Sequence, residues 1–254
     1  MAFVLRNEWV GLCLVVPFAF AQGGPPLRTD DPGTPGNKNW EINIACTQTF
    51  SPIEREIEIP LVDVNYGVGD RIQLKFEIPC LYRDDGSGQY RRALGDALFG
   101  MKWRFYEESR NGGWRMSAYP QVEILNPQIQ DGERVGRSAR FLLPIKVTHE
   151  LGPVEINFEA GYWFARHNPG ERLLGLAVGH EFAKRFEGLL EICNDVTLGG
   201  SSRSTTVDIG GRYEFRKTML VLFMAGRSII SSGPLNGQPT FLGYAGLQIQ
   251  LTNR

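Results

Sequence analysis

Beyond its first 21 residues the sequence has no long apolar run. It also has no large excess of charge of either sign, and it has few histidines. Past residue 21, no apolar stretch approaches the roughly 20 residues that a membrane-spanning helix needs. The mean hydropathy of −0.21 likewise excludes a helical membrane protein. The 27 Lys and Arg nearly balance the 28 Asp and Glu, so nothing in the composition indicates nucleic acid as a partner.

The sequence motifs of common catalytic and metal sites are also absent. There is no G-x-S-x-G, no H-E-x-x-H and no C-x-x-C. Of the three histidines, His149 falls in a predicted turn, His180 on a predicted strand, and His167 in a loop without a neighbouring Ser. We therefore expect no catalytic residues, no metal and no cofactor. The acid pairs at 30–31 and 84–85 are of a type that binds calcium, but we expect them to be solvated loop acids.

The first 21 residues have the features of a secretory signal peptide. Arg6 provides a weak positive region, residues 9–18 are apolar, and Ala19-Phe20-Ala21 resembles a cleavage site. This predicts a signal peptide at 1–21 and a mature chain that starts near Gln22. Three cysteines remain after residue 21: Cys46, Cys80 and Cys193. Because their number is odd they form no disulfide framework, although a disulfide between Cys46 and Cys80 stays open.

From residue 40 onward, apolar and polar residues alternate. In Arg71–Ile78 every second side chain is apolar, so a strand there has one apolar and one polar face. We predict an all-β fold, an antiparallel transmembrane β-barrel of about 12 strands over residues 40–254, preceded by an irregular Pro/Gly-rich segment at 22–39. The predicted strands are 40–50, 55–66, 70–82, 94–107, 113–125, 138–149, 152–165, 171–183, 186–196, 204–215, 218–229 and 240–251.

Connections, aromatic residues and prolines refine this prediction. Short and long connections alternate, as in outer-membrane barrels with short periplasmic turns and long outer loops. Because proline cannot donate to the ladder, prolines inside predicted strands indicate bulges, strands that leave the bilayer, or strands made of two pieces; these are Pro60, Pro79, Pro120 and Pro144. Aromatic residues near strand ends suggest interfacial girdles; they are Trp40, Tyr66, Tyr82, Phe105, Tyr106, Trp114, Tyr162, Trp163, Phe164, Tyr213, Phe241 and Tyr244.

Charged side chains on the strands define the predicted lumen. Facing lipid at mid-height would cost about 2–4 kcal/mol for Lys or Arg, so these side chains must face inward. The predicted pore-lining residues are Arg71, Gln73, Lys75, Glu77, Glu155, Glu159, Asp208, Arg212 and Glu214. Both signs of charge are mixed, which suits a salt-bridged interior or a selectivity lining.

Three segments resemble outer-membrane proteins of the "MetA-pathway of phenol degradation" family. They are Pro25–Gly36 followed by Trp40–Asn43, Val64–Lys75 and Leu94–Phe105. The resemblance implies an outer-membrane barrel that transports small molecules, hydrophobic or aromatic ones among them, and it supplies no catalytic residues. The chain departs from many such barrels because it ends in Thr252-Asn253-Arg254 and lacks the terminal aromatic residue that the assembly machinery reads.

Together these patterns predict a passive channel for small solutes in the bacterial outer membrane, with segment 22–39 and the outer loops controlling entry. Its expected partners are outer-membrane lipid, small-molecule solutes and, during biogenesis, the barrel-assembly machinery. Two alternatives stay open. One is a soluble periplasmic or secreted β-sandwich that binds a ligand, and the other is an outer-membrane lipid hydrolase.

Overall fold

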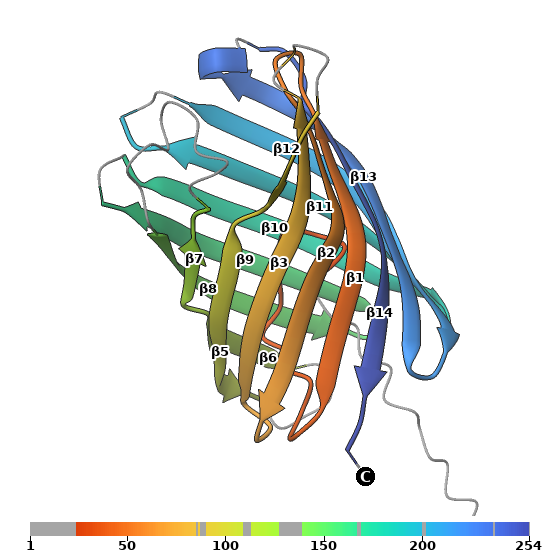
Figure 1. Ribbon diagram of the computed structural model, residues 1–254. Coiled ribbons are helices and arrows are strands. Elements are labelled where there is room, and N and C mark those ends of the chain that lie inside the picture. Colours follow the sequence, from red (N-terminus) through yellow and green to blue (C-terminus); the bar gives the residue numbers. More distant parts are fainter. Residues whose placement is uncertain are drawn as a thin grey trace, which may run out of the picture.

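The computed structural model describes residues 24–84, 86, 90–108, 113–126, 139–166, 169–199, 202–235 and 237–253. The predicted signal peptide lies outside these ranges. No helix in the described ranges is both long and apolar enough to span a membrane. The described strands all belong to one antiparallel sheet (Figure 1): β1 Trp40–Phe50, β2 Arg55–Val68, β3 Ile72–Asp84, β4 Arg91–Leu94, β5 Ala97–Glu107, β6 Trp114–Ala118, β7 Gln121–Ile124, β8 Ala139–Leu151, β9 Val154–Ala165, β10 Glu171–Ala183, β11 Phe186–Thr197, β12 Arg203–Arg216, β13 Met219–Ser232 and β14 Phe241–Leu251.

The sheet closes on itself into a barrel. β1 pairs with β14 along its whole length, from Trp40 opposite Leu251 to Phe50 opposite Phe241. Two places around the barrel are each shared by two strands, since β4 and β5 both pair with β3, and β6 and β7 both lie between β5 and β8. The barrel therefore has 12 strand positions, which confirms the predicted fold and excludes the β-sandwich alternative.

The observed strand ends lie within three residues of the predicted ones. Two-residue turns at 152–153, 184–185 and 217–218 lie at the end of the barrel where β1 begins and β14 ends, marked by the C-terminus in Figure 1. We call this the short-turn end, which faces the periplasm in outer-membrane barrels. The opposite end, with the longer connections, is the long-loop end.

The four in-strand prolines lie where the ladder is irregular, as their chemistry requires. Pro60 lies in a register shift between β2 and β3, and Pro120 separates β6 from β7. Pro79 faces the gap between β4 and β5, where its carbonyl accepts a hydrogen bond from the Gly95 amide at 2.8 Å. The Pro144 carbonyl accepts another from the Tyr119 amide, next to the β6–β7 gap, at 3.1 Å.

The barrel is apolar outside and polar inside. On β3, Leu74 and Phe76 are exposed, whereas their neighbour Gln73 is buried. The same inversion holds on the other strands, where the buried charged residues include Asp63, Lys102, Lys146, Glu155, Glu159, Glu191, Asp208 and Arg212. A soluble protein has the opposite distribution. The apolar wall must therefore face lipid, which places the chain in the bacterial outer membrane.

The girdle prediction holds for some aromatic residues and fails for two. Trp40, Trp114 and Tyr213 are exposed near the short-turn ends of their strands. Trp163 and Tyr244 instead line a cavity inside the barrel. The strand parity explains the difference for Trp163, which lies four residues after the inward-facing Glu159 and therefore on the same face of β9.

Substitutions on the two faces of β3 should have opposite consequences. Leu74→Arg or Phe76→Arg should block barrel assembly, because an arginine against lipid costs about 2–4 kcal/mol. Lys75→Ala should leave the barrel folded, because Lys75 faces the interior and its partner Asp63 also accepts hydrogen bonds from Asn43 and Asn65. The folded fraction can be measured by gel migration with and without boiling. Equal losses for both faces would contradict their assignment.

Candidate functional site

Residues 24–39 contain no helix or strand and occupy the lumen of the barrel; we call this segment the plug. Its red trace enters the barrel interior in Figure 1. Leu27, Thr29 and Asp31 are each more than 90% buried, which is unusual for an irregular segment. The plug then returns to Asn39, directly before β1. The segment that was predicted to be irregular is therefore folded against the inner wall.

The last residues of the plug bind the short-turn end of β2. The Lys38 amide donates to the Gly67 carbonyl at 2.8 Å, and the Gly67 amide donates to the Asn39 carbonyl at 3.0 Å. The Gly69 amide donates to Asn37 Oδ1 at 3.0 Å. A Cβ atom at Gly67 would lie 1.7 Å from the Gly36 carbonyl oxygen, so only glycine permits this approach.

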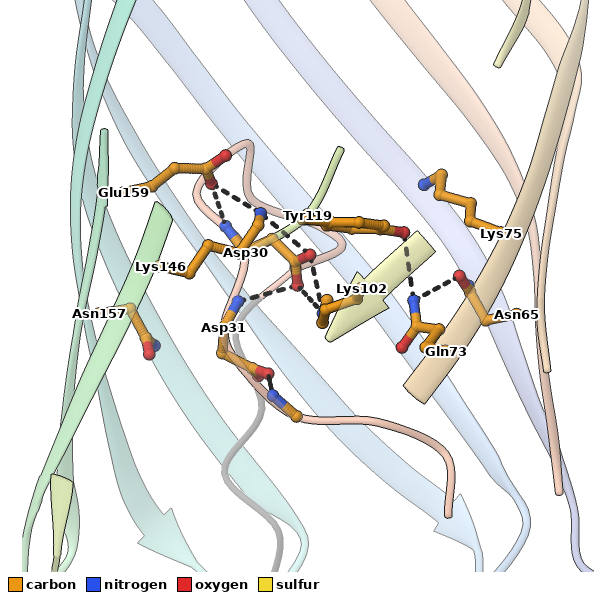
Figure 2. Close-up of polar contacts among 12 residues, drawn as sticks. Asp30, Asp31, Asn65, Gln73, Lys75, Lys102, Tyr119, Lys146, Asn157 and Glu159 are labelled. Atoms are coloured by element: carbon orange, nitrogen blue, oxygen red, sulfur yellow. Dashed lines mark hydrogen bonds and ion pairs between the residues drawn. The ribbon is translucent and has the colours of Figure 1, made fainter. Parts of the chain in front are cut away.

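The centre of the plug is held by a cluster of four charged residues, drawn in Figure 2, which we call the anchor cluster: Asp30, Lys102, Lys146 and Glu159. Asp30 Oδ2 lies 2.9 Å from Lys102 Nζ and 3.1 Å from Lys146 Nζ. Lys146 also pairs with Glu159 at 3.0 Å, and Glu159 accepts a hydrogen bond from the Asp30 amide at 2.9 Å. Two carboxylates thus offset two ammonium groups. Both lysines also lie 5.0 Å from the centre of the Tyr119 ring, within cation–π range.

The anchor cluster changes the acidity of the plug. Burial alone would raise the pKa of Asp30, but the ammonium groups of Lys102 and Lys146 outweigh burial and hold the pKa well below its usual value. A carboxyl group whose pKa is lowered in the folded state stabilises the fold at pH values above its ordinary pKa of about 3.9. This contribution to the free energy of unfolding is lost only as the pH falls through the lowered pKa. Asp30 therefore keeps its ion pairs from neutral pH down to about pH 4.

A second set of contacts holds the plug on β10 and β11. Glu191 accepts hydrogen bonds from the backbone amides of Arg28, at 3.1 Å, and Thr29. The Arg28 guanidinium pairs with Asp195 at 2.8 Å. On β10, a Cβ atom at Gly175 would lie 2.2 Å from Thr29 Oγ1, so the glycine leaves the space that the Thr29 side chain occupies.

The first described residues of the plug bind β12. Arg212 donates to the carbonyl oxygens of Gly24 and Pro25 at 3.0 Å and 2.9 Å, and pairs with Glu187 at 3.1 Å. Next to this contact, the plug contributes one apolar side chain, Leu27, to a small buried cluster with Ala177, Leu189 and Met224. The plug is thus bound through charges and backbone groups, and it also buries the apolar side chains of Pro26, Leu27 and Pro32.

A cavity of about 450 Å³ remains between the plug and the barrel wall. Along β1 its lining runs from Glu41, near the short-turn end, to Thr49, near the long-loop end. Apolar side chains also line it, and we call the leucines and the tryptophan of the barrel wall among them the apolar ring: Leu61, Leu98, Leu142, Trp163, Leu173 and Leu242. Leu98, Leu142 and Trp163 each lie four residues nearer the long-loop end than the anchor residue of the same strand, about 13 Å along it.

The structure brings most of the predicted pore-lining residues into the lumen. Five of them line the cavity: Gln73, Lys75, Glu77, Glu159 and Arg212. Glu155 and Asp208 are fully buried, beside Arg115 and Thr206 respectively, and do not line the cavity. Arg71 is exposed in the turn before β3, and Glu214 is half-buried near the short-turn end of β12. Their role in lining an open pore stays a prediction.

Sequence reasoning placed Glu159 and Arg212 in the lumen but missed the other residues that bind the plug. The expectation that Asp30 is a solvated loop acid is wrong, because both ion pairs of Asp30 lie inside the barrel. Lys102 and Lys146 carried a usable signal, since each lies between two apolar residues on a predicted strand. Such a lysine must face the interior and needs an acidic partner, which the plug supplies.

The histidines have aromatic surroundings. His149 stacks on Trp114 with ring centres 4.2 Å apart, and His180 lies edge-on to Phe182 at 4.5 Å. His167 lies outside the described residues. The surroundings of the two described histidines thus consist of ring contacts near the short-turn end.

The cysteines and acids of the described ranges hold neither a disulfide nor a metal-type cluster. Cys46, Cys80 and Cys193 are all free thiols, so the pair between Cys46 and Cys80 that the sequence left open does not form. Within the same ranges, no group of three or more His, Cys, Asp or Glu is arranged to hold a metal ion. Cys193 is buried, with Sγ 3.6 Å from Thr29 Oγ1 of the plug.

Comparison with known proteins supports the fold. No family model matches the chain and no curated protein matches it significantly, so the resemblance to the phenol-degradation family stays a prediction. The chain is similar to the COG4313 outer membrane channel from Pseudomonas putida F1, with 10% identity and a TM-score of 0.61 over 87% of this chain and 97% of that one. It is also similar to the NanC porin, with 6% identity and a TM-score of 0.60 over 82% of this chain and 98% of that one. The KdgM porin in complex with disordered oligogalacturonate is similar as well, with 8% identity and a TM-score of 0.56 over 82% of this chain and 98% of that one. At these identities the likeness shows a shared fold, that of outer-membrane barrels.

The substitution Asp30→Asn should release the plug. It removes the carboxylate that pairs with Lys102, and breaking a buried ion pair costs about 3–5 kcal/mol. In a chain that also carries Cys46→Ser and Cys80→Ser, the reaction of Cys193 with a maleimide should then become at least about tenfold faster. Asp70→Asn removes the same charge from an exposed turn and should leave labelling unchanged. Slow labelling in both variants would show that Asp30 does not hold the plug.

Proposed function

We propose that this chain is a passive outer-membrane channel for small solutes, hydrophobic and aromatic ones among them, which the plug closes. The observation that carries this proposal is the plug itself, a segment bound inside a membrane-spanning barrel mainly by ion pairs and hydrogen bonds. Such contacts exchange for contacts with water at a small net cost. The plug can therefore leave the wall without unfolding the barrel, and the vacated lumen becomes a water-filled path.

The apolar ring supports the choice of solute. In a lumen otherwise lined with charged and amide groups, Leu98, Leu142 and Trp163 form an apolar patch on the long-loop side of the anchor cluster. Pockets for small organic ligands combine such apolar lining with a few polar groups. Because Leu98, Leu142 and Trp163 lie on the long-loop side of the anchor cluster, a solute that enters from outside meets these three side chains before it meets Asp30. Trp163 offers an aromatic face, with the Arg140 guanidinium 4.1 Å from its ring centre.

A disulfide between the plug and the wall tests the closing role. Thr29 Oγ1 lies 3.6 Å from Cys193 Sγ, so Thr29→Cys should cross-link to Cys193 under copper–phenanthroline oxidation. We combine it with Cys46→Ser and Cys80→Ser in the mature chain and call the oxidised product the locked protein. In liposome swelling assays with glucose and phenyl glucoside, the locked protein should pass both solutes at least about tenfold more slowly than the reduced form.

The control is the same chain with Thr29 retained, in which oxidant should change nothing. Reduction of the locked protein with dithiothreitol should restore swelling. Equal swelling by the locked and reduced proteins would overturn the proposed role of the plug.

The substitution Trp163→Ala tests the solute class. Loss of an inward aromatic face worth about 0.5–1.5 kcal/mol should lower the swelling rate with phenyl glucoside relative to glucose by about 2- to 10-fold. Trp103→Ala removes a tryptophan that is 52% exposed on the outer wall and should keep the wild-type ratio. An unchanged ratio in Trp163→Ala would contradict an aromatic preference at the apolar ring.

A further inference from the structure

We propose that the cavity beside the plug is a cation-selective passage along β1–β3, which conducts small hydrated cations while the plug stays bound. This inference rests on the proposed function in taking the barrel to be a channel. It adds that the closed state is permeable to ions and that a defined wall sets the sign of the ions that pass.

The plug is bound to one side of the barrel. From Gly24 to Asp31, the hydrogen bonds and ion pairs that the structure shows between plug and barrel all involve β5, β8, β9, β11 or β12. The contacts with β2 and the β2–β3 turn begin at Thr34, at the short-turn end. The cavity borders the plug and extends to β1–β3, where its lining on β1 comprises Glu41 and residues 47–49, a span of about 26 Å along the strand. Because strands of such barrels tilt by about 35–45°, this span corresponds to about 20 Å of the roughly 25 Å height of the apolar band.

The wall on this side is acidic. The charged residues of β1–β3 that line the cavity are four carboxylates and one ammonium group: Glu41, Glu58, Asp63, Glu77 and Lys75. Lys75 lies between two of the acids, 3.2 Å from Asp63 and 2.8 Å from Glu77. With every group ionised, four negative charges and one positive charge leave this wall with three negative charges.

The cations that line the cavity are already paired, whereas some of the acids are not. Each lining Lys or Arg has a carboxylate oxygen within 3.2 Å; these pairs are Arg28–Asp195, Lys75–Glu77, Lys102–Asp30, Lys146–Glu159 and Arg212–Glu187. Among the described residues, three lining acids form no ion pair: Asp31, Glu41 and Glu58. Glu41 accepts a hydrogen bond from Asn43 at 3.4 Å, and Glu58 accepts one from Thr47.

The plug presents an acid to the same cavity. Asp31 is only 2% exposed, and its Oδ1 accepts a hydrogen bond from the Gly33 amide. Its second oxygen, Oδ2, has no hydrogen-bond partner in the described part of the chain. The charge of this carboxylate is therefore not offset by a partner, and it favours cations over anions in the adjoining cavity. The unpaired acids of plug and wall therefore concentrate cations and exclude anions.

The test measures ion selectivity with the plug held in place. The locked protein is recorded in planar bilayers under a KCl gradient at pH 8.5, where the carboxylates are ionised. The conductance should persist, and the reversal potential should give a K⁺ permeability about tenfold above that of Cl⁻. A locked protein that conducts no ions, or that prefers Cl⁻, overturns the proposal.

Two substitutions test whether the acids of β1–β3 set the ion selectivity. Glu41→Gln and Glu58→Gln keep side-chain size and hydrogen bonding while removing unpaired charges, and together they should lower the K⁺/Cl⁻ ratio of the locked protein at least about threefold. Asp70→Asn, in an exposed turn off the cavity, should leave the ratio unchanged. Equal ratios in the double variant and the Asp70 control would show that β1–β3 do not set the selectivity. The swelling of the reduced protein tests the proposed solute channel separately. Failure of the cation-selective passage therefore does not imply failure of the solute channel, and the reverse also holds.

Discussion

A chain that crosses a bilayer as strands must bond every backbone amide and carbonyl within the protein, because the lipid offers no partner. The closure of β1 on β14 meets this constraint over the full length of both strands. The prolines are where it is hardest to meet, and there the neighbouring strands adjust. The Pro79 carbonyl binds the amide of Gly95 in the gap between β4 and β5, and the Pro120 carbonyl binds the amide of Met101 at 3.0 Å. Two interrupted strands are thus compatible with a continuous barrel.

The same constraint explains why the strands could be predicted from the sequence. Lipid on one side and a polar lumen on the other impose a period of two on every strand, as Gln73, Leu74 and Lys75 illustrate. Residue type alone was a poorer guide to facing. Trp163 and Tyr244 were assigned to girdles because they are aromatic, yet both face the lumen. For Trp163, counting from the inward Glu159 would have given the correct face. Arg71 lies off the cavity for another reason, since the turn includes it and β3 begins one residue later.

A role for segment 22–39 in controlling entry was predicted, but the path of the plug through the barrel could not be predicted because nothing local specifies it. Asp30 contacts Lys102, which is 72 residues away in the sequence, and Glu159, which is 129 residues away. The partner of the Thr29 amide, Glu191, is 162 residues away. An irregular segment has no period from which to infer a face, so only the partners reveal its path. The partners were visible in part. Lys102 and Lys146 are inward cations on mostly apolar strands, and a buried cation requires an acid from elsewhere in the chain.

The chemistry of the plug fits the proposed opening. If large apolar side chains had filled the lumen, opening would expose an apolar surface to water at a cost proportional to its area. The apolar side chains that the plug buries are Leu27 and two prolines, Pro26 and Pro32, and its hydrogen bonds and ion pairs are contacts that water can replace. When the plug leaves, Asp30 and Lys102 both regain hydration, so separating the pair costs far less than deleting one partner. A polar plug in a polar lumen therefore allows a closed state that is specific and an open state that remains accessible.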